Sequence, residues 1–338
     1  MKAWEIQNDG GIDALTAVEH PMPEPGPHQI LVRVGAVSLN YRDLLHVLGV
    51  VDQDRWPLIP CSDGAGEVVA VGQGVTRFAV GDQVAGTFFQ RWSAGGITAE
   101  VMESALGGRQ SGMLAEYVCL SEEGAVAVPA GWTAAEAATL PCAALTAWHA
   151  LVSKGRLKAG ETVLVMGTGG VSLFALQIAK MHGARVILTS SSDDKLARAR
   201  ELGADELINY RTNPDWEQQV LELTGGVGVD HVVEVGGSGT LERSLTAVRF
   251  GGSVWLIGVL TGFEAKVDPM PVLFKSACVQ GIYVGSREMF EAMNAAFSAN
   301  GLRPVIDQRF PLEQAREAFH CMQAAGHFGK IVIEIPGA

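Results

Sequence analysis

The sequence predicts a two-domain α/β protein, in which one domain is a doubly wound parallel sheet and the other is β-rich and barrel-like. Three observations support this prediction. A strand, a glycine-rich turn, a helix and a second strand follow one another between Glu161 and Asn209, and strands then alternate with helices as far as Val284. Residues 1–125 instead hold short Val-rich strands separated by Gly and Pro clusters. With 338 residues, the chain is long enough for two separate cores.

The stretch around the glycine-rich turn has the order of a βαβ unit. Residues 163–166 form an apolar run that is short enough for a buried parallel strand. A helical pattern runs from Val171 to Met181, and residues 185–188 form a second β-branched strand. A glycine cluster by itself is more often an ordinary loop, but this order predicts a dinucleotide-binding turn.

The glycines of this turn have separate expected roles. Gly167 permits a tight turn, and Gly169 and Gly170 let backbone N–H groups approach a pyrophosphate. The helix that begins near Val171 supplies unpaired donors and the positive end of its dipole. Ser172 replaces the third glycine of the G-x-G-x-x-G pattern, and it is small enough for close packing of helix and strand.

The end of the second strand bears on the choice of nicotinamide cofactor. An acidic residue there would bond the ribose 2′-OH of NAD, but the sequence places Ser190 and Ser191 at this point. Hydroxyl groups tolerate a 2′-phosphate that a carboxylate would repel, and Lys195 would pair with it. We therefore expect NADP(H), with NAD as the alternative. The serines have a second explanation, because Ser192 followed by two aspartates is a good N-cap for the next helix.

Composition and charge argue against several classes of partner. Lys and Arg number 25 against 37 Asp and Glu, a net charge of −12, so neither nucleic acid nor an anionic membrane is expected as the main partner. No apolar run is long enough to span a membrane, and the N-terminus does not resemble a signal peptide. The five scattered cysteines lack CxxC spacing, which predicts reduced thiols in the cytoplasm.

The remaining elements can be assigned in chain order. We expect strands in the first domain at Lys2–Ile6, Gln29–Val37, Gly66–Val71, Gln83–Gly86 and Ala115–Leu120. In the second domain we expect helices at Thr133–Ala150 and Leu241–Phe250 and strands at Val229–Val235, Gly252–Gly258 and Val279–Val284. The remainder carries two helices and a strand, at Arg287–Ala299, Leu312–Ala325 and Lys330–Ile335.

Several motifs, spread in order along nearly the whole chain, resemble those of the medium-chain dehydrogenase/reductase superfamily. They are GEVVAVGQGVTRFAVGDQV from Gly66, LPCAALTAW from Leu140, GAD from Gly203, VDHVVEVGG from Val229, WLIG from Trp255 and GKIV from Gly329. The resemblance implies a GroES-like catalytic domain made of residues 1–125 and 285–338. It also implies a Rossmann cofactor domain over residues 126–284.

Many members of that superfamily hold a catalytic zinc ion with Cys, His and Cys. In this chain the first of these positions is Asn40 and the second is Ser62, and only Cys142 matches. Asparagine and serine are poor zinc ligands, and one thiolate cannot supply the roughly 10 kcal/mol or more of a protein zinc site. The usual cluster of four cysteines is also missing, because residues 88–112 contain no cysteine. We therefore predict that no metal is bound.

Loss of the metal changes the expected chemistry. Reduction of a plain ketone needs a strong stabiliser for the developing alkoxide, whereas an activated alkene or a quinone spreads charge onto an oxygen that neutral donors can hold. The chain resembles zinc-free quinone oxidoreductase-like and enone reductase-like members, which use NADPH and keep an asparagine at the position of Asn40. That resemblance implies that Asn40 orients the substrate or the nicotinamide, with Tyr41, Arg42 or water stabilising charge or returning a proton. The Tyr41 phenol could equally pack in the core with a satisfied hydroxyl.

The resemblance also implies further cofactor contacts, each with a plain structural alternative. Thr146 would lie beside the nicotinamide, or bond its own helix backbone. Lys195 and Tyr210 would clasp the 2′-phosphate, although a solvated helix lysine looks the same in sequence. Gly258 would let the backbone approach the nicotinamide, or simply end a strand. Lys330 would reach the cofactor, or serve as an edge-strand charge.

Two other residues favour ordinary structural roles. Cys142 has the pattern of a small buried hydrophobic residue more than that of a reactive thiol. His46 lies in an apolar helical context and is more typical of a core histidine than of a proton donor.

Three functional hypotheses follow. The first is a zinc-independent, NADPH-dependent oxidoreductase that transfers hydride to a quinone, an enone or another activated alkene. The alternative is an NAD(P)-dependent alcohol dehydrogenase or ketone reductase, and a non-catalytic NADPH-binding sensor ranks third. The expected partner is a small carbonyl compound or activated alkene. By analogy with the family, we also expect a homodimer or homotetramer that pairs strand Val279–Val284 between subunits.

Overall fold

The chain folds into two units, and the first unit is made of two separate segments. The computed structural model describes residues 1–51, 56–262, 264 and 266–335. The first unit comprises Met1–Leu145 and Gly285–Ala338, and the second comprises Thr146–Val284. The first boundary therefore lies after Leu145, and the expected boundary after residue 125 was wrong, because residues 125–127 form a strand of the first unit's sheet. Residues 336–338, the end of the expected first domain, lie outside the described residues.

The second unit is built on a parallel sheet. Within its described residues, six strands pair in the order β10-β9-β8-β11-β12-β13, and every pairing is parallel. The strands are β8 (Thr162–Met166), β9 (Arg185–Ser190), β10 (Glu206–Asn209), β11 (Val229–Glu234), β12 (Val248–Leu256) and β13 (Cys278–Gly281). The order reverses between β8 and β11, which confirms the doubly wound sheet expected from the sequence.

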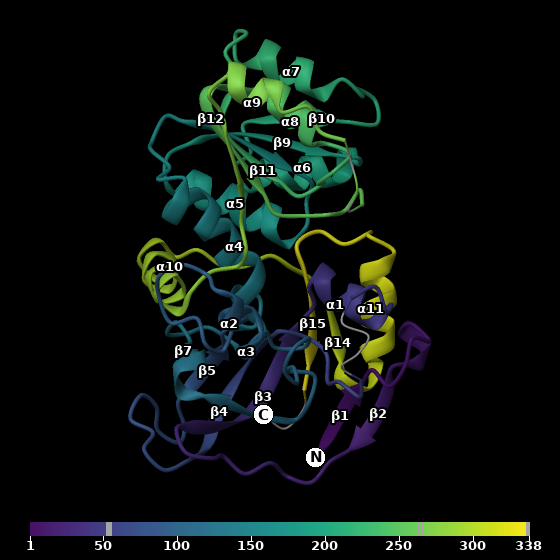
Figure 1. The fold of residues 1–338 in the computed structure, drawn as a ribbon, viewed down its shortest axis with the longest axis vertical. Helices are drawn as coiled ribbons and strands as arrows, with labels where there is room; N and C mark the ends of the chain where they lie inside the picture. The colour runs from purple at the N-terminus through teal and green to yellow at the C-terminus, as the bar shows by residue number, and fades with distance from the viewer. Residues whose placement is uncertain (52–55, 263, 265, 336–338) are drawn as a thin grey trace. The chain divides into compact units, whose positions relative to one another are not determined.

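Helices cover both faces of this sheet. They are α5 (Gly170–Met181), α6 (Asp193–Glu201), α7 (Trp216–Leu223), α8 (Leu241–Ala247) and α9 (Met270–Phe274). Helix α5 packs against β8 and β9, whereas α8 packs against β11 and β12 from the opposite face (Figure 1). Their apolar side chains bury the Val-rich strands on both sides, so those strands read as continuous hydrophobic runs.

Two expected helices are shorter than the sequence pattern suggested. The helix expected over 241–250 ends at Ala247, because Val248 begins β12 and pairs with Val229. The helix expected over 133–150 is interrupted. Thr133 caps α3 (Ala134–Ala137) as expected, π-helical segments at Leu140–Ala144 and His149–Lys154 follow, and α4 (Leu145–Trp148) lies between them. Pro141 lacks an N–H donor, which accounts for the break after α3.

The first unit is organised around a mainly antiparallel sheet. Its described strands pair in the order β14-β15-β3-β4-β5-β7, and β6 also pairs with β3. They are β3 (Gln29–Ser38), β4 (Asp63–Val71), β5 (Gln83–Gly86), β6 (Tyr117–Ser121), β7 (Ala125–Ala127), β14 (Ile306–Pro311) and β15 (Lys330–Glu334), with a separate pair β1 (Lys2–Glu5) and β2 (Thr16–Glu19). Strand β15 is antiparallel to β3, so the C-terminal segment completes a sheet begun near the N-terminus.

The described part of the first unit also contains helices. They are α1 (Tyr41–Val47), α2 (Ala99–Met102), α3, α10 (Arg287–Asn300) and α11 (Ala315–Gln323), with 3-10 turns at Ile12–Ala14, Glu122–Gly124 and Leu312–Gln314. None of the helices in the described ranges has both the length and the apolar character needed to cross a membrane.

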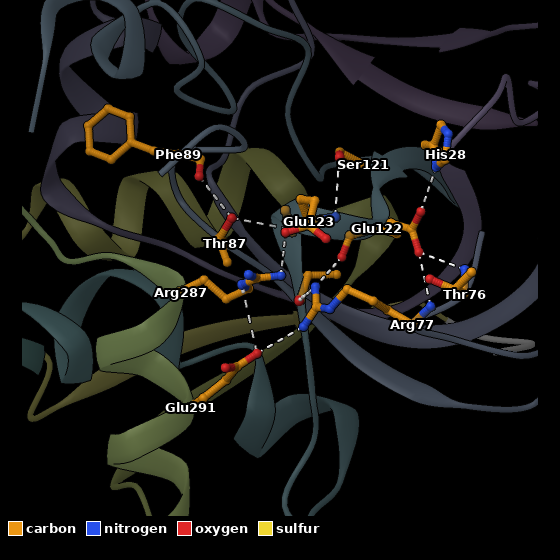
Figure 2. A network of polar contacts seen from close by, with 12 residues as sticks. His28, Thr76, Arg77, Thr87, Phe89, Ser121, Glu122, Glu123, Arg287 and Glu291 are labelled. Atoms are coloured by element: carbon orange, nitrogen blue, oxygen red, sulfur yellow. Dashed lines mark hydrogen bonds and ion pairs between the residues drawn. The ribbon is translucent and has the colours of Figure 1, made fainter. Parts of the chain in front are cut away.

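A polar network attaches α10 to the N-terminal part of the first unit (Figure 2). Glu122 accepts hydrogen bonds from the backbone N–H groups of Thr76 (2.8 Å) and Arg77 (2.9 Å). Arg77 in turn pairs with Glu291 of α10 at 2.8 Å. Bonds from Thr76, from His28 and from Arg77 lower the pKa of the Glu122 carboxyl to about 2. The two segments of the first unit, Met1–Leu145 and Gly285–Ala338, are therefore joined by an ion pair as well as by strand pairing.

Candidate functional site

The glycine-rich turn has the geometry that the sequence predicted. Gly167 follows β8 with φ +76°, a conformation that favours glycine. Gly169 is the N-cap of α5, and a Cβ added there would meet no atom within 4 Å, so the surface beyond it is open. Ser172 is buried and its Oγ donates to the Met166 carbonyl at 2.7 Å. The turn thus presents the first N–H groups of α5, from Gly170 and Val171 onward, to a space that would accept a pyrophosphate.

The end of β9 brings the predicted 2′-phosphate residues into one neighbourhood. Ser190 pairs with Asn209 on β10, and the Tyr210 N–H donates to the Ser190 carbonyl at 3.0 Å. Ser192 caps α6 by accepting from the Lys195 N–H at 3.4 Å, which confirms the capping explanation. The Tyr210 side chain is exposed and the Ser190 side chain is buried. Both explanations of the serine run are therefore compatible with the structure.

The buried carboxylate of Glu234 binds the backbone that follows β11. In the sequence, Glu234 was recognised only as one residue of the motif that begins at Val229. Glu234 Oε1 accepts from the N–H groups of Gly236 (2.7 Å) and Gly237 (3.0 Å) and from the Thr240 hydroxyl (2.7 Å). Its backbone carbonyl accepts from the Gly258 N–H at 3.2 Å. The signal that could have revealed this role is an acid at the end of a buried strand, directly before glycines.

Gly258 is required by packing inside the second unit. A Cβ at this position would lie 2.0 Å from the Val235 carbonyl oxygen. Gly258 therefore has a packing role, and the nicotinamide contact implied for it remains a prediction. Thr146 is buried at the start of the second unit, in α4, and its nicotinamide contact also remains a prediction.

In the first unit, the residue at the first metal position is fixed by a distant lysine. Asn40 directly precedes α1, and Lys330 is the first residue of β15. The Lys330 Nζ donates to the Asn40 Oδ1 at 2.6 Å and to the Leu39 carbonyl at 2.6 Å. Lys330 is 3% exposed and Asn40 is 7% exposed, so this ammonium and this amide meet away from bulk solvent.

The other two metal positions lie on the same hydrogen-bonded chain. The Asn40 Nδ2 lies 3.5 Å from the Ser62 Oγ, and that hydroxyl donates to Asp63 Oδ1 at 2.6 Å. Asp63 Oδ2 accepts from the Cys142 backbone N–H at 2.9 Å. Asn40, Ser62 and Cys142, which the sequence pattern placed together, are therefore brought together by the fold.

The neighbouring residues of α1 have distinct environments. Asp43 is fully buried and accepts from the Asn40 backbone N–H at 2.8 Å, so it anchors the start of α1. Arg42 is held by the Leu106 carbonyl at 2.7 Å and by Asp43 at 3.2 Å, and its guanidinium lies over Phe88. Tyr41 is 41% exposed, so the core-packing explanation for its phenol was wrong.

Burial dominates the protonation of this cluster. It raises the pKa of Asp63 to about 6 and also raises the pKa of Asp43. The strongest opposing effect is the positive charge of Lys330 at Asp63 and that of Arg42 at Asp43. Burial and the Asp63 charge raise the pKa of the Cys142 thiol well above its ordinary value. Cys142 is therefore a protonated thiol at neutral pH, which favours the ordinary structural role expected for it.

This set of donors does not suit a zinc ion. An amide, a hydroxyl and a neutral thiol do not make the tetrahedral nitrogen and sulfur site that zinc prefers. The Lys330 ammonium also donates to the Asn40 oxygen, the atom that a bound cation would need as a ligand, and its positive charge would repel that cation. Within the described ranges, no group of three or more His, Cys, Asp and Glu residues could hold a metal ion.

Comparison with known proteins agrees with both units. Residues 26–130 match the model of the alcohol dehydrogenase GroES-like domain, and residues 170–299 match that of the zinc-binding dehydrogenase domain. A zinc-type alcohol dehydrogenase-like protein of Schizosaccharomyces pombe is 41% identical over 96% of each chain. A quinone oxidoreductase of Pseudomonas aeruginosa is 32% identical over 96% of each chain.

Solved structures give the same result. The crystal structure of a candidate alcohol dehydrogenase from Sinorhizobium meliloti 1021 is 48% identical, covers 99% of each chain and has a TM-score of 0.91. A NAD-dependent alcohol dehydrogenase is 36% identical over 99% of each chain, with a TM-score of 0.90. A mycobacterial protein complexed with NADPH is 28% identical over 99% of each chain, with a TM-score of 0.83. The chain therefore belongs to the medium-chain dehydrogenase/reductase superfamily of nicotinamide-dependent oxidoreductases, with a GroES-like and a Rossmann-like domain.

Proposed function

We propose that this protein is a zinc-independent, NADPH-dependent oxidoreductase that reduces a quinone, an enone or another activated alkene. The observation that carries the proposal is the cluster of Asn40, Ser62 and Cys142, which places an amide donor, a hydroxyl and a protonated thiol where relatives of the zinc type would offer metal ligands. Neutral donors suit a reaction whose negative charge is delocalised onto a conjugated oxygen. A localised alkoxide would require a stronger stabiliser.

The cofactor residues of this proposal lie in the second unit. We assign the pyrophosphate to the turn and first helical residues at Gly167, Gly169, Gly170 and Val171, and the 2′-phosphate to Ser190, Ser191, Lys195 and Tyr210. Thr146 and Gly258 are assigned to the nicotinamide end. NADPH is preferred over NADH because no carboxylate among residues 189–192 would repel the 2′-phosphate.

The substrate residues lie in the first unit. The Asn40 amide donates to the substrate oxygen, and Tyr41, which is exposed at the start of α1, is the candidate to deliver the proton. Bound NADPH would supply the hydride. In an enone, the hydride adds to the β-carbon, the alkene π pair shifts to the bond between the α-carbon and the carbonyl carbon, and the carbonyl π pair moves onto oxygen. A proton then adds to the α-carbon of this enolate, and the carbonyl group forms again. The product is the saturated ketone.

A substrate panel in metal-free buffer tests this function. We expect oxidation of NADPH with small enones and quinones, at rates that chelators do not change. Turnover that chelators abolish and zinc restores would overturn the proposal. A second candidate, an alcohol dehydrogenase or ketone reductase, is favoured by the alcohol dehydrogenase names of several relatives, and faster turnover of plain ketones would select it. Tight NADPH binding without turnover of any acceptor would instead indicate a sensor.

We further propose that two copies of the chain pair through the second unit. Among the described residues, β13 is the last strand of the parallel sheet, and no described strand pairs with its outer edge. Exposed apolar side chains lie nearby in sequence and structure, with Phe250 at 71%, Leu273 at 65% and Phe274 at 72% exposure. Sedimentation should therefore give a dimer or tetramer, and Leu273→Glu combined with Phe274→Glu should yield monomers. A monomeric wild-type protein would contradict this assignment.

The free cysteines fit a cytoplasmic location, because a reducing compartment keeps thiols unpaired. Fractionation of cells that express the protein tests this assignment.

A further inference from the structure

We propose that Lys330 is a positioning residue whose ammonium holds the Asn40 amide in one orientation and strengthens its N–H donors toward the substrate oxygen. This inference rests on the proposed function for the role of Asn40, but the contact itself can be tested without turnover. It differs from the cofactor contact that the sequence resemblance implied for Lys330.

Strand pairing brings Lys330 to Asn40 across the sheet. Gly329 has φ +94°, and the Lys330 N–H donates to the Val305 carbonyl at 3.0 Å, which starts β15 at this residue. The next residue, Ile331, accepts from the Leu39 N–H at 3.0 Å and so continues the β15–β3 ladder. The Lys330 side chain therefore begins opposite the end of β3, directly before α1, and its position is set by backbone hydrogen bonds.

The ammonium determines which way the Asn40 amide faces. An ammonium group has three donors and no acceptor, so the atom of Asn40 at 2.6 Å from the Lys330 Nζ must be the oxygen. The amide nitrogen then faces Ser62. Because the Ser62 hydroxyl donates to Asp63, its oxygen is left to accept from the Asn40 Nδ2. The chain of hydrogen bonds thus runs in one direction, from the lysine cation to the Asp63 carboxylate.

One amide proton of Asn40 remains for a ligand. The Asn40 Nδ2 carries two N–H donors, and among the described residues Ser62 is its one acceptor. The cation on the amide oxygen draws electron density away from the nitrogen, and this polarisation is strong because both groups are buried. The remaining N–H is therefore a stronger donor than a solvated amide would provide.

Two buried carboxyl groups near Lys330 stabilise its ammonium without a metal ion. Asp43 and Asp63 are both fully buried, and the Lys330 charge lowers the pKa of each against the effect of burial. These two carboxyl groups are therefore close enough to Lys330 to interact electrostatically with its buried ammonium. An ammonium fixed in the protein and acting through Asn40 would then supply part of the positive potential that zinc supplies in other members of the family.

The test compares Lys330→Met with a matched control, Lys180→Met. Lys180 lies near the C-terminal end of α5. Its ammonium also donates to a backbone carbonyl, that of Ala184, and forms an ion pair with Asp205. For Lys330→Met we expect kcat for an enone to fall about 10- to 100-fold while the Kd of NADPH stays within about twofold. The control should change neither value. An increased Kd with unchanged kcat would overturn the proposal and make Lys330 a cofactor contact.

A second measurement is independent of catalysis. In protein labelled with 15N-asparagine, the side-chain amide resonances of Asn40, identified by their loss in Asn40→Asp, should shift in Lys330→Met and stay in place in Lys180→Met. Unshifted resonances would overturn the contact. If wild-type enzyme turns over no acceptor, the proposed function fails, whereas these resonances still decide whether Lys330 holds Asn40.

The contact can also be examined from the lysine side if Lys330→Met does not fold. With 15N-lysine labelling, the Lys330 ammonium resonance should move in Asn40→Asp, because its partner changes from an amide oxygen to a carboxylate. An ammonium resonance that is the same in both proteins would overturn the proposal.

Discussion

The two regions assigned to cofactor and substrate are built in opposite ways. In the second unit, the turn from Gly167 to Ser172 is local, and each of its features follows from residues within one strand–helix connection. In the first unit, Asn40 depends on Lys330, a residue 290 positions away. The local site could be located from spacing and residue type alone. The distant one required a fold that brings the two chain segments together.

The difference predicts how each region tolerates mutation. Gly169 has open space around it, so a change there should affect a ligand more than the fold. Asn40, Ser62, Asp63 and Lys330 are buried and bonded to one another, so a change in one alters the surroundings of the others. The following experiments test this contrast.

The largest effect is expected for Asn40→Asp. The carboxylate would still accept from Lys330, but it offers no N–H to the substrate oxygen. We expect kcat to fall about 10²- to 10³-fold, the usual loss for one donor at a developing oxyanion, in steady-state assays with an enone. Asn300→Asp, an exposed asparagine at the end of α10, is the control. Full activity of Asn40→Asp would rule out the amide as a donor.

A pH effect is expected at His46, which is buried in α1 one turn after Arg42. Burial, with Arg42 and then Arg109, lowers its pKa to about 3. A histidine with a lowered pKa stabilises the fold above its unfolded pKa of about 6.5, and this contribution is lost as pH falls toward 3. The free energy of unfolding should drop by about 3 kcal/mol between pH 7 and pH 4. In denaturant titrations, His46→Gln should flatten that slope, and an unchanged slope would assign it to other groups.

The local region should separate binding from stability. Gly169→Ala adds a Cβ where nothing lies within 4 Å and φ is −78°, so the melting temperature should hardly change. The Kd of NADPH should rise about tenfold, equivalent to about 1.4 kcal/mol, because the methyl group occupies the approach of the pyrophosphate. Gly258→Ala is the contrasting variant, since its Cβ would lie 2.0 Å from the Val235 carbonyl and should lower the melting temperature. Unchanged NADPH affinity in Gly169→Ala would place the cofactor elsewhere.

The smallest effect is expected at Ser190. Ser190→Asp brings a carboxylate toward the 2′-phosphate, and like-charge repulsion of about 1 kcal/mol near water would shift the ratio of kcat/KM for NADPH over NADH about fivefold toward NADH. Because Ser190 is buried, Ser191→Asp is the companion variant with a partly exposed side chain. Equal KM values for the two cofactors in the wild type would remove the basis of this prediction.

Much of the fold could be predicted from local pattern. The strand β8, the helix α5 and the Ser192 cap follow from short-range spacing, and the structure confirms them. The limits of α8 and β12 could not be predicted, because Val248 fits either element until its pairing with Val229 is known. Strand β14 was not predicted, because its residues alternate weakly and its pairing partner β15 lies about 20 residues further along the chain.

The same limit applies to the candidate site. Asn40, Ser62 and Cys142 could be found because family motifs mark their positions. The contact of Lys330 with Asn40, and the Glu234 acceptor of the loop after β11, depend on which segments meet in three dimensions. A single sequence shows residue types, but it does not show which buried charge compensates which.

The return of β14 and β15 to the first unit also affects how the protein is made. The ribosome synthesises the segment up to Val284, which contains the whole second unit, before it synthesises β15, the strand that pairs with the end of β3. During that interval the end of β3 has an open edge, and open strand edges favour misassembly. Asn40 acquires its lysine only after the second unit has been synthesised, so a chain that stops before β15 would lack the contact between Lys330 and Asn40.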